Sequence, residues 1–371
     1  MGKNILELNT SIEMSNTSKD SVTIKDEVKF RQMVEICSAL FAGTDVDKFG
    51  KQKDAVVKKL MSLADSAQYG DIKARAEINT IVKFMIEPKL LEAMKVFDFL
   101  GNYHELAYHE QPKVKTYNYE NIDARLQAAN SDVSFAGHNW MEYPVMTRTI
   151  SAGMAIDYRE LASGNFDGSV AEEAAQVQID MNNKAVAYVL GIMKNSLANN
   201  TKYVKNYATY SGNAPTQAQV DSMVAKMRKM GKVAILGDYG ILSAICDWNG
   251  YKTVGDAKIP FYSPTQVDEI AKAGLNGFYK GSTLVELANP YNYTKPLADK
   301  SGFETYYADD ELYFTAAGNK SPLNIFRRGG ITTMQGTDIE TGTIKTRFDM
   351  EIGADVTKGR EFEIGMMAKE A

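Results

Sequence analysis

The sequence predicts an α+β fold, and three stretches of the 371-residue chain support this prediction. A long uninterrupted helix is predicted from Ser169 to about Ala198. Helical periodicity also dominates residues 26–100, whereas strand patterns dominate from Thr283 onward. Separate helix-rich and strand-rich stretches are typical of an α+β fold.

The long helix begins at a capping box, in which Ser169 and Glu172 can satisfy backbone donors of the first turn. Apolar residues then recur at spacings of three and four, which predicts one buried stripe: Val170, Ala174, Val177, Met181, Ala185, Tyr188 and Ile192. At 1.5 Å per residue this helix would be roughly 43 Å long. A helix of this length is expected to lie along an extended body, as a spine.

The N-terminal part of the chain is expected to be helical after a polar start. Residues 1–25 are rich in Asn, Ser, Thr and Lys, which indicates an extended arm or a disordered tail. Three helices are predicted over Phe30–Phe41, Val56–Ala64 and Asp71–Ile86. A short fourth helix is expected to begin at Pro88, because proline suits the first helical turn, and to end before Gly101.

Two predicted strands flank a long segment without regular structure. Lys113–Tyr119 is one strand, and a second begins near Trp140 and runs to Ile156. The intervening stretch of about twenty residues has no tight-turn dipeptide and no proline, and loops of that length are usually functional. We therefore expect a long hairpin arm that leaves the body. A surface loop between two core strands is the alternative.

The next stretch predicts a compact layer of helices and strands. Residues 199–215 change in composition and are a plausible boundary, and Thr216 with Gln219 forms a second capping box. A buried strand at Val233–Leu236 and a helix at Ile241–Trp248 follow. A further helix should start at Ser263, and the remaining strands are expected at Leu284–Leu287, Glu311–Ala316, Ile325–Phe326, Thr343–Ile352 and Glu361–Met366.

Composition limits the possible function. The length is typical of two or three domains, and 44% hydrophobic with 24% charged residues is ordinary for a globular chain. A net charge of −5 argues against a basic grip on nucleic acid. The two cysteines, Cys37 and Cys246, suggest buried thiols in a reducing compartment. Because no signal peptide or membrane-length apolar run is found, we expect the chain to be cytosolic when made.

No intact motif for metal binding or catalysis is present. His104-Glu105 and His109-Glu110 resemble a zinc-protease signature, but the histidines are five residues apart instead of four, and His138 stands alone. The calcium-loop, phosphate-loop and nucleophile-elbow patterns are each incomplete. Arg327-Arg328-Gly329-Gly330 could bind an anion, although a charged loop between strands is the ordinary explanation. We expect no enzyme activity, no metal and no cofactor.

Residues Tyr119–Leu190 resemble the major capsid proteins of tailed bacteriophages. The resemblance lies in the long loop, in Tyr143-Pro144-Val145 leading into Ile150–Ile156, and in Tyr158-Arg159-Glu160-Leu161 before the capped long helix. It covers roughly residues 90–371 and implies the Hong Kong 97-like fold, which encapsulins share. The helices predicted within residues 26–90 exceed a simple arm, so an elaborated arm and a retained scaffold-like segment both stay open.

The resemblance implies a domain organisation for the whole chain. It assigns residues 1–100 to an N-terminal arm and helical segment, 101–112 and 152–200 to a peripheral domain with the spine helix, 113–151 to an extended hairpin loop, 201–335 to an axial domain, 336–360 to a long strand of the peripheral domain, and 361–371 to a return strand.

The resemblance also implies a function. The chain would be a major capsid protein that forms the hexamers and pentamers of an icosahedral phage head around double-stranded DNA, without sequence-specific DNA contact and without a membrane. Scaffold, portal and decoration proteins are the other expected partners, and assembly would take place in the host cytoplasm. An encapsulin-like compartment, another structural assembly and an enzyme are the alternatives. The residues expected to contact neighbouring subunits are Tyr117, Tyr119, Arg125, Trp140 and Tyr143.

Overall fold

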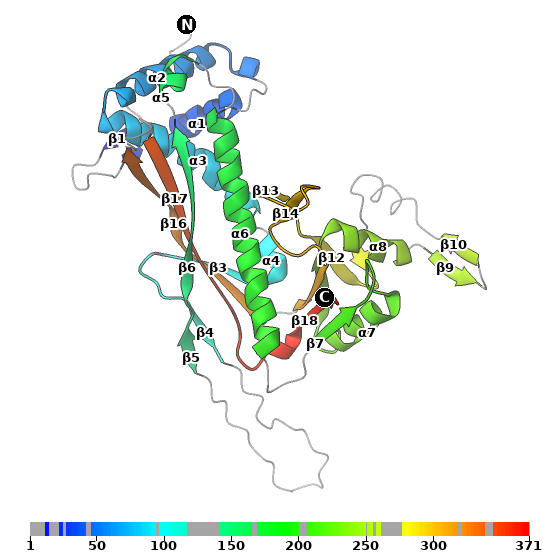
Figure 1. Cartoon of the computed structure of the whole chain (residues 1–371). Helices are drawn as coiled ribbons and strands as arrows, with labels where there is room; N and C mark the ends of the chain where they lie inside the picture. Colours follow the sequence, from blue (N-terminus) through cyan, green and yellow to red (C-terminus); the bar gives the residue numbers. More distant parts are fainter. Residues whose placement is uncertain are drawn as a thin grey trace. The chain divides into compact units, whose positions relative to one another are not determined.

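A computed structural model shows a mixed α and β protein (Figure 1). It describes residues 12–14, 22–24, 27–41, 46–93, 96–116, 141–156, 158–164, 169–199, 206–249, 251–254, 257–260, 277–317, 321–337 and 344–370. The chain divides into two compact units. Unit 1 comprises Met1–Met94, Thr149–Asn182 and Gly330–Glu351, and unit 2 comprises Lys95–Arg148, Asn183–Gly329 and Ile352–Ala371. The predicted α+β class is confirmed.

Unit 1 contains the N-terminal helices that periodicity predicts, together with two short helices that were not predicted. They are α1 (Glu27–Phe41), the short 3-10 helix η2 (Val46–Phe49), α2 (Lys51–Gln68), α3 (Ile72–Ala93) and α5 (Tyr158–Ala162). Phe30, Met33 and Cys37 of α1 are fully or almost fully buried, and the Phe30 ring meets the edge of Phe84 in α3 at 5.1 Å. Aromatic packing of this geometry adds to the apolar burial that holds the helices together.

The predicted helix break at Pro88 is wrong. Helix α3 continues through this residue to Ala93, and only the five residues of α4 (Val96–Leu100) form a separate helix. A proline inside a helix removes one backbone hydrogen bond, to the carbonyl four residues earlier. The following stretch to Ala93 consists of good helix formers, which favour continuation past that loss.

The long predicted helix is confirmed as α6 (Ser169–Asn199), with 31 residues and a length of about 46 Å. Ala174, Val177 and Met181 are buried as predicted. Beyond Ala185 the predicted stripe is wrong: Tyr188 and Ile192 are half-buried, and the buried side chains are Val186, Val189, Leu190, Met193 and Leu197. The helix is apolar on several sides there, so spacing alone cannot select the buried face. The side chains of the Ser169–Glu172 capping box lie outside the described residues.

A four-stranded sheet has the order β3-β16-β17-β6. Its strands are β3 (Asn102–Leu106), β6 (Thr147–Ile156), β16 (Leu323–Thr337) and β17 (Ile344–Val356), and β3 runs parallel to β16. Strand β3 was not predicted, because its polar and histidine-containing sequence gives a weak strand signal.

The segment Arg327–Gly330 lies inside β16, so the predicted loop is wrong. Arg327 is 5% exposed and pairs with Glu105 at 3.2 Å, while Arg328 donates hydrogen bonds to the carbonyl oxygen of Tyr108. Gly329 has φ of 68°, and a Cβ at that position would lie 2.3 Å from the Tyr108 ring. Glycine is required there by conformation and by space.

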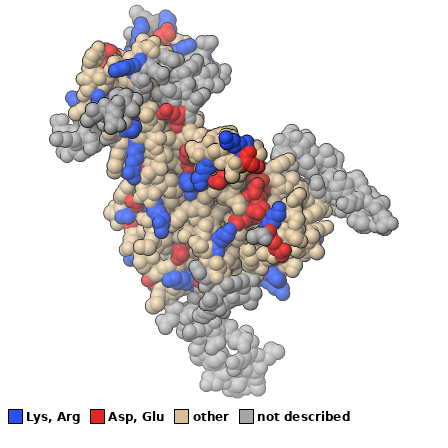
Figure 2. Space-filling model, in the orientation of Figure 1, with Lys and Arg blue, Asp and Glu red and all other residues tan. Residues whose placement is uncertain are grey.

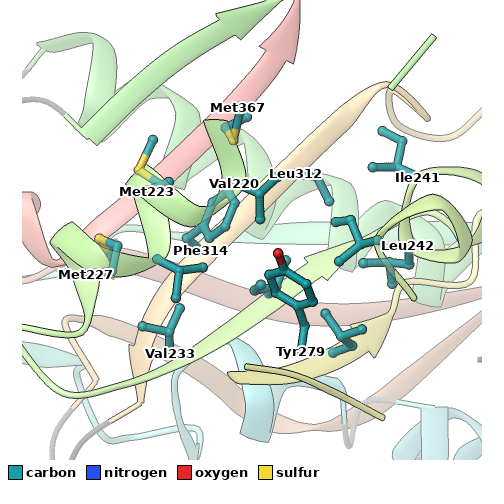
Figure 3. Close-up of a cluster of buried hydrophobic side chains, with 14 of the residues drawn as sticks. Val220, Met223, Met227, Val233, Ile241, Leu242, Tyr279, Leu312, Phe314 and Met367 are labelled. Carbon is teal, nitrogen blue, oxygen red and sulfur yellow. The ribbon is translucent and has the colours of Figure 1, made fainter. Parts of the chain in front are cut away.

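The six-stranded sheet of unit 2 has the order β11-β12-β8-β15-β18-β7. Its strands are β7 (Asn206–Tyr210), β8 (Lys232–Gly237), β11 (Phe278–Tyr279), β12 (Ser282–Glu286), β15 (Glu311–Ala317) and β18 (Ile364–Lys369), accompanied by α7 (Gln217–Met227) and α8 (Tyr239–Asn249). Side chains from both helices and the sheet point toward one another in Figure 3, with Phe314 and Val220 fully buried. The predicted layer is confirmed. The capping box is present too, because the Thr216 N–H donates to the side-chain oxygen of Gln219 at 2.9 Å. Strand β7 was not predicted.

Smaller elements complete the described part of the chain. Two-stranded sheets form between β1 (Ile12–Met14) and β2 (Val22–Ile24), β4 (Lys113–Lys115) and β5 (Glu142–Pro144), β9 (Tyr251–Val254) and β10 (Ala257–Pro260), and β13 (Tyr291–Pro296) and β14 (Phe303–Thr305), and the 3-10 helix η3 (Glu361–Glu363) precedes β18. The helix predicted from Ser263 lies outside the described residues. Within the described ranges, no helix is long and apolar enough to span a membrane.

Candidate assembly surfaces

The predicted hairpin arm has a paired base in unit 2, which we call the hairpin root (residues 112–116 and 141–145). Strands β4 and β5 are antiparallel, with Val114 opposite Tyr143. Backbone hydrogen bonds close both ends of the pairing, from Thr116 N to Met141 O at 2.8 Å and from Val145 N to Pro112 O at 2.9 Å. The prediction that these strands pair is therefore confirmed. The second predicted strand, however, is two strands, β5 and β6, separated by Val145 and Met146.

Tyr143 fixes the hairpin root to the end of β17. Its hydroxyl donates to the Val356 carbonyl oxygen at 3.4 Å and accepts from the Lys358 N–H at 3.3 Å. The Lys358 ammonium lies 4.3 Å from the centre of the Tyr143 ring, a cation–π contact. Burial, reinforced by the neighbouring Asp355 carboxylate, raises the pKa of Tyr143, so the phenol stays protonated and can donate.

An apolar cluster supports the same root. Val114, Val145 and Phe326 are buried together, and Leu106 and Tyr143 pack against them. His104 stacks on Phe326 with ring centres 5.5 Å apart. A groove of about 440 Å³ runs beside the root and is lined by His104, Leu106, Val114 and Phe326 and by polar groups that include Lys113 and Asn324. The root therefore brings Thr116 and Met141 next to each other.

Unit 1 carries a second groove, which we call the sheet groove, on one face of its share of the four-stranded sheet. It has a volume of about 760 Å³ and is lined by Ser151–Ala155 of β6, Met334 and Gly336 of β16, and Lys345–Arg347 of β17. Small side chains from β6 form much of its floor. Arg347 lies on its rim and donates to Ser151 at 2.8 Å and to Asp349 at 2.7 Å.

The opposite face of that sheet packs on a helix. Along β17, Lys345 and Arg347 are exposed, whereas Thr346 and Phe348 are buried. The Thr346 hydroxyl donates to Asn79 of α3 at 3.0 Å. This alternation assigns one face to the core of unit 1 and leaves the groove-bearing face open in the described chain. This groove combines small residues from β6 with the cationic side chains of Lys345 and Arg347.

Only one of the predicted contact residues can be placed. Tyr143 is half-buried at the hairpin root, while Tyr117, Tyr119, Arg125 and Trp140 lie outside the described residues. Their role as subunit contacts stays a prediction, because the structure contains a single chain.

Three exposed methionines next to these surfaces were not predicted as contact candidates. Met141 and Met146 flank β5 and are 73% and 87% exposed, and Met334 in the sheet groove is 59% exposed. Large exposed apolar side chains of this kind mark interaction surfaces when they gather beside a groove. The period-two alternation of the strands contains the relevant signal, because it places Met334 on the face opposite the buried Ile331.

The histidines and cysteines of the described chain have structural surroundings. His104 lies in a strand and stacks on Phe326, a geometry unlike the helical zinc signature. Among the residues that the structure describes, no group of three or more His, Cys, Asp or Glu side chains could hold a metal ion. Cys37 and Cys246 are both buried and are not joined in a disulfide, and burial raises the pKa of Cys37 to about 12.

Comparisons with solved structures return shells and compartments. A protein of Mycobacterium phage Bobi is 10% identical, with 76% of this chain and 90% of that chain covered and a TM-score of 0.47. The mature capsid of bacteriophage PhiM1 is 12% identical, with coverages of 73% and 86% and a TM-score of 0.46. The SrpI encapsulin complex of Synechococcus elongatus PCC 7942 is 11% identical, with coverages of 74% and 86% and a TM-score of 0.41.

Comparison with protein families is more direct. No curated protein matches the chain. A profile of the family described as "SPbeta prophage-derived putative capsid protein YonB" matches residues 21–368, which is nearly the whole sequence. This match includes the hairpin root, α6 and both larger sheets, and it confirms the resemblance to phage capsid proteins. The chain belongs to the YonB family of prophage-derived capsid proteins.

Proposed function

We propose that this protein is the major capsid protein of a phage head, forming hexamers and pentamers that close into an icosahedral shell around double-stranded DNA. The observation that supports this most strongly is the family match over residues 21–368. Its role would be structural and not catalytic, and its place would be the virion after assembly in the host cytoplasm. Scaffold, portal and decoration proteins would be transient or peripheral partners.

We also propose the Hong Kong 97-like domain organisation for this chain. Residues 113–151 would form the extended loop, 101–112 with 152–200 the peripheral domain, and 201–335 the axial domain. The remaining parts would be an N-terminal helical segment over residues 1–100, a long peripheral strand over 336–360 and a return strand over 361–371. The six-stranded sheet with α7 and α8 supports the axial assignment, because it has a closed core of its own.

The hairpin loop would lie across an adjacent subunit. Its root is fixed by Tyr143, Val114 and Val145, so the two ends of the loop leave unit 2 at defined positions. The sheet groove, with its open face and small-residue floor, is our proposed receiving surface on the neighbour. Tyr117, Tyr119, Arg125 and Trp140 would then be buried between subunits, where aromatic side chains and arginine contribute most to binding.

The negative net charge of the chain supports a shell that a different protein fills with DNA. With a net charge of −5, the protein offers little non-specific attraction for phosphates, whose binding depends on neutralisation by Lys and Arg. DNA would be confined by the wall without being gripped by it. This accords with the expected absence of sequence-specific DNA contacts.

Electron microscopy of the purified full-length protein tests the proposal. We expect closed particles of uniform size from the wild-type chain. Deleting Ile122–Gly137 should leave folded subunits that form no closed particles, because the deleted segment supplies the contact with the neighbour. As a control, the same sixteen residues are replaced with a Gly/Ser linker of about equal length. This variant separates the effect of losing the side chains from the effect of shortening the loop. Normal particles from the deletion would contradict the arm's role, and a monomeric wild type would contradict the function.

A further inference from the structure

The strand registers of the six-stranded sheet bring carboxylates to one of its ends. Gly237 of β8 is level with Glu286 of β12 and with Leu312 of β15, and Glu311 is level with Ala368 of β18. Residues that follow β8, β12 and β18, or precede β15, therefore gather there. We call this the acidic end, and its carboxylates are Asp238, Glu286, Asp309, Asp310, Glu311 and Glu370. Figure 2 shows acidic side chains grouped on the visible surface of this unit.

Contacts with tyrosines show that these carboxylates lie close together. Tyr210 donates to the Asp310 carbonyl oxygen at 2.6 Å, and burial together with the Asp310 and Asp309 charges raises the pKa of Tyr210 to about 12. Burial together with the Asp238 and Glu286 charges raises the pKa of Tyr307. Tyr210 in β7 and Tyr307, in the segment between β14 and β15, therefore each lie near carboxylates of the acidic end.

Cations compensate only part of the acidic end. Lys194 of α6 forms an ion pair with Glu311, which also accepts a hydrogen bond from Tyr313. Lys369 is exposed at the end of β18. The structure gives no ion pair for Glu286 or Asp309 among the described residues, and both are exposed. The excess negative charge therefore faces outward.

Cations gather at the opposite end of the same sheet. Lys232 begins β8 and is level with Ala317, the last residue of β15. Lys226 lies in the last turn of α7, and Arg228 and Lys229 lie in the turn that joins α7 to β8. All four side chains are exposed. We call this group the basic end.

The β11–β12 turn extends the basic end. A Cβ at Gly281 would lie 2.5 Å from the Arg228 guanidinium, which places the turn against Arg228. The neighbouring Lys280 is paired with Asp221 at 2.6 Å, so its charge is largely compensated within the subunit. Among the described residues, the uncompensated positive charge of the basic end is therefore carried by Lys226, Arg228, Lys229 and Lys232.

The acidic end also offers apolar anchors. The β13–β14 hairpin follows β12 and precedes β15, and the Asn289 side chain ties its two ends together through the backbone of Tyr306 and Tyr307. Tyr291 and Tyr293 are 58% and 63% exposed, and the Tyr293 ring meets Phe303 at 5.2 Å. Exposed aromatic rings that pack against one another beside charged groups are typical of the centre of a protein–protein interface.

We propose that the acidic end of one copy docks against the basic end of the next copy, head to tail, within each ring. This inference rests on the proposed function, which supplies the second copy. The two surfaces are complementary in charge and lie at opposite ends of one rigid sheet, so each copy can use both at once. A contact between two different surfaces of the same chain repeats around a ring and closes when the rotation fits. Complementary charge sets the register of such a contact and opposes wrong pairings.

Reversing charge at one end and then at both tests this inference. The basic-end variant carries Lys226→Glu and Lys229→Glu, and the acidic-end variant carries Glu286→Lys and Asp309→Lys. Each introduces like-charged side chains at two positions of the contact, so each should abolish closed particles under conditions in which the wild type assembles. The variant with all four substitutions restores opposite charges between the altered positions of the two ends and should restore particles. Lys51→Glu with Lys58→Glu on α2 of unit 1 is the control with the same change in net charge as the basic-end variant, and it should assemble.

The outcomes are distinguishable from a failure of the proposed function. Circular dichroism and thermal unfolding first establish that each variant is folded. Particles from both two-substitution variants, or none from the folded four-substitution variant, would overturn the head-to-tail contact while leaving the shell function intact. Loss of binding to a DNA probe by the basic-end variant, with shells unchanged, would assign that end to nucleic acid and overturn the inference. A wild type that never assembles contradicts both proposals.

Discussion

The two larger sheets differ in how they are covered. The six-stranded sheet is enclosed within unit 2, where α7 and α8 bury a continuous core that includes Phe314, Ile235 and Val220 at 0% exposure. The four-stranded sheet has an open groove of about 760 Å³ in its unit 1 part, with Met334 at 59% exposure. One sheet is complete within a single chain, and the other keeps a face available. Under the proposed function, the difference separates residues that fold the subunit from residues that would assemble it.

The largest expected effect comes from replacing matched apolar side chains in the two sheets. Phe314→Ala should lower the free energy of unfolding by about 3–5 kcal/mol, because it removes a fully buried ring and leaves a cavity. Met334→Ala in the sheet groove should change it by no more than about 0.5 kcal/mol, yet reduce the yield of closed particles. Urea denaturation and electron microscopy measure the two quantities. A large loss of stability in Met334→Ala would mean that the groove face belongs to the core.

A smaller effect is expected from two glycines of the same strand, β16. Gly329→Ala should destabilise by roughly 1–3 kcal/mol, because φ is 68° and the added methyl would meet the Tyr108 ring. Gly336→Ala should be near neutral, since, apart from its chain neighbours, no atom of the described residues lies within 4 Å of its would-be Cβ. Thermal unfolding compares them. Equal effects would contradict the tight contact at Tyr108.

The smallest expected effect is a pH dependence at the covered end of β17. Burial raises the pKa of Asp355 above its usual 3.8, and the hydrogen bond with Tyr143 opposes that rise. A carboxyl group with a raised pKa in the folded state contributes stability below the unfolded pKa and loses it as pH rises through the folded pKa. Asp355→Asn should therefore flatten this part of the pH profile of stability just above pH 4, relative to the wild type. An unchanged profile in urea titrations would show that Asp355 is not a source of the dependence.

Sequence patterns predicted the helices well because helical burial repeats over many residues. Helices α1 and α2 contain the stretches predicted to be helical, and α6 has nearly the predicted length. The error within α6 arose where apolar residues surround the helix, so that only the packed neighbours decide which of them are buried.

Strands were harder to predict because their partners are distant in sequence. Strand β3 has a polar sequence, but it pairs with β16 more than 200 positions later along the chain. Two arginines and two glycines indicate a loop when only local propensity is considered. In the folded chain Arg327 forms an ion pair with Glu105, and Arg328 donates a hydrogen bond to the Tyr108 carbonyl oxygen. Because these partners compensate both guanidinium groups, Arg327–Gly330 can form part of a strand.

The candidate surfaces were predicted only in part. The pairing that forms the hairpin root follows from two strand signals, and Tyr143 was selected as an aromatic in that region. The sheet groove and the two charged ends depend on register between strands, which no local pattern contains. Asp238, Glu286 and Asp309 are spread over about seventy positions and become neighbours only through the order of the sheet.

The burial of both cysteines has a practical consequence for following the protein in solution. Cys37 and Cys246 are the only thiols in the chain, and neither is accessible to a maleimide reagent in the folded state. A single cysteine introduced at Met146, which is 87% exposed, would therefore accept one fluorophore at a unique position. Dye attached there would stand beside the base of the arm, and energy transfer between differently labelled copies would record the joining of subunits in real time.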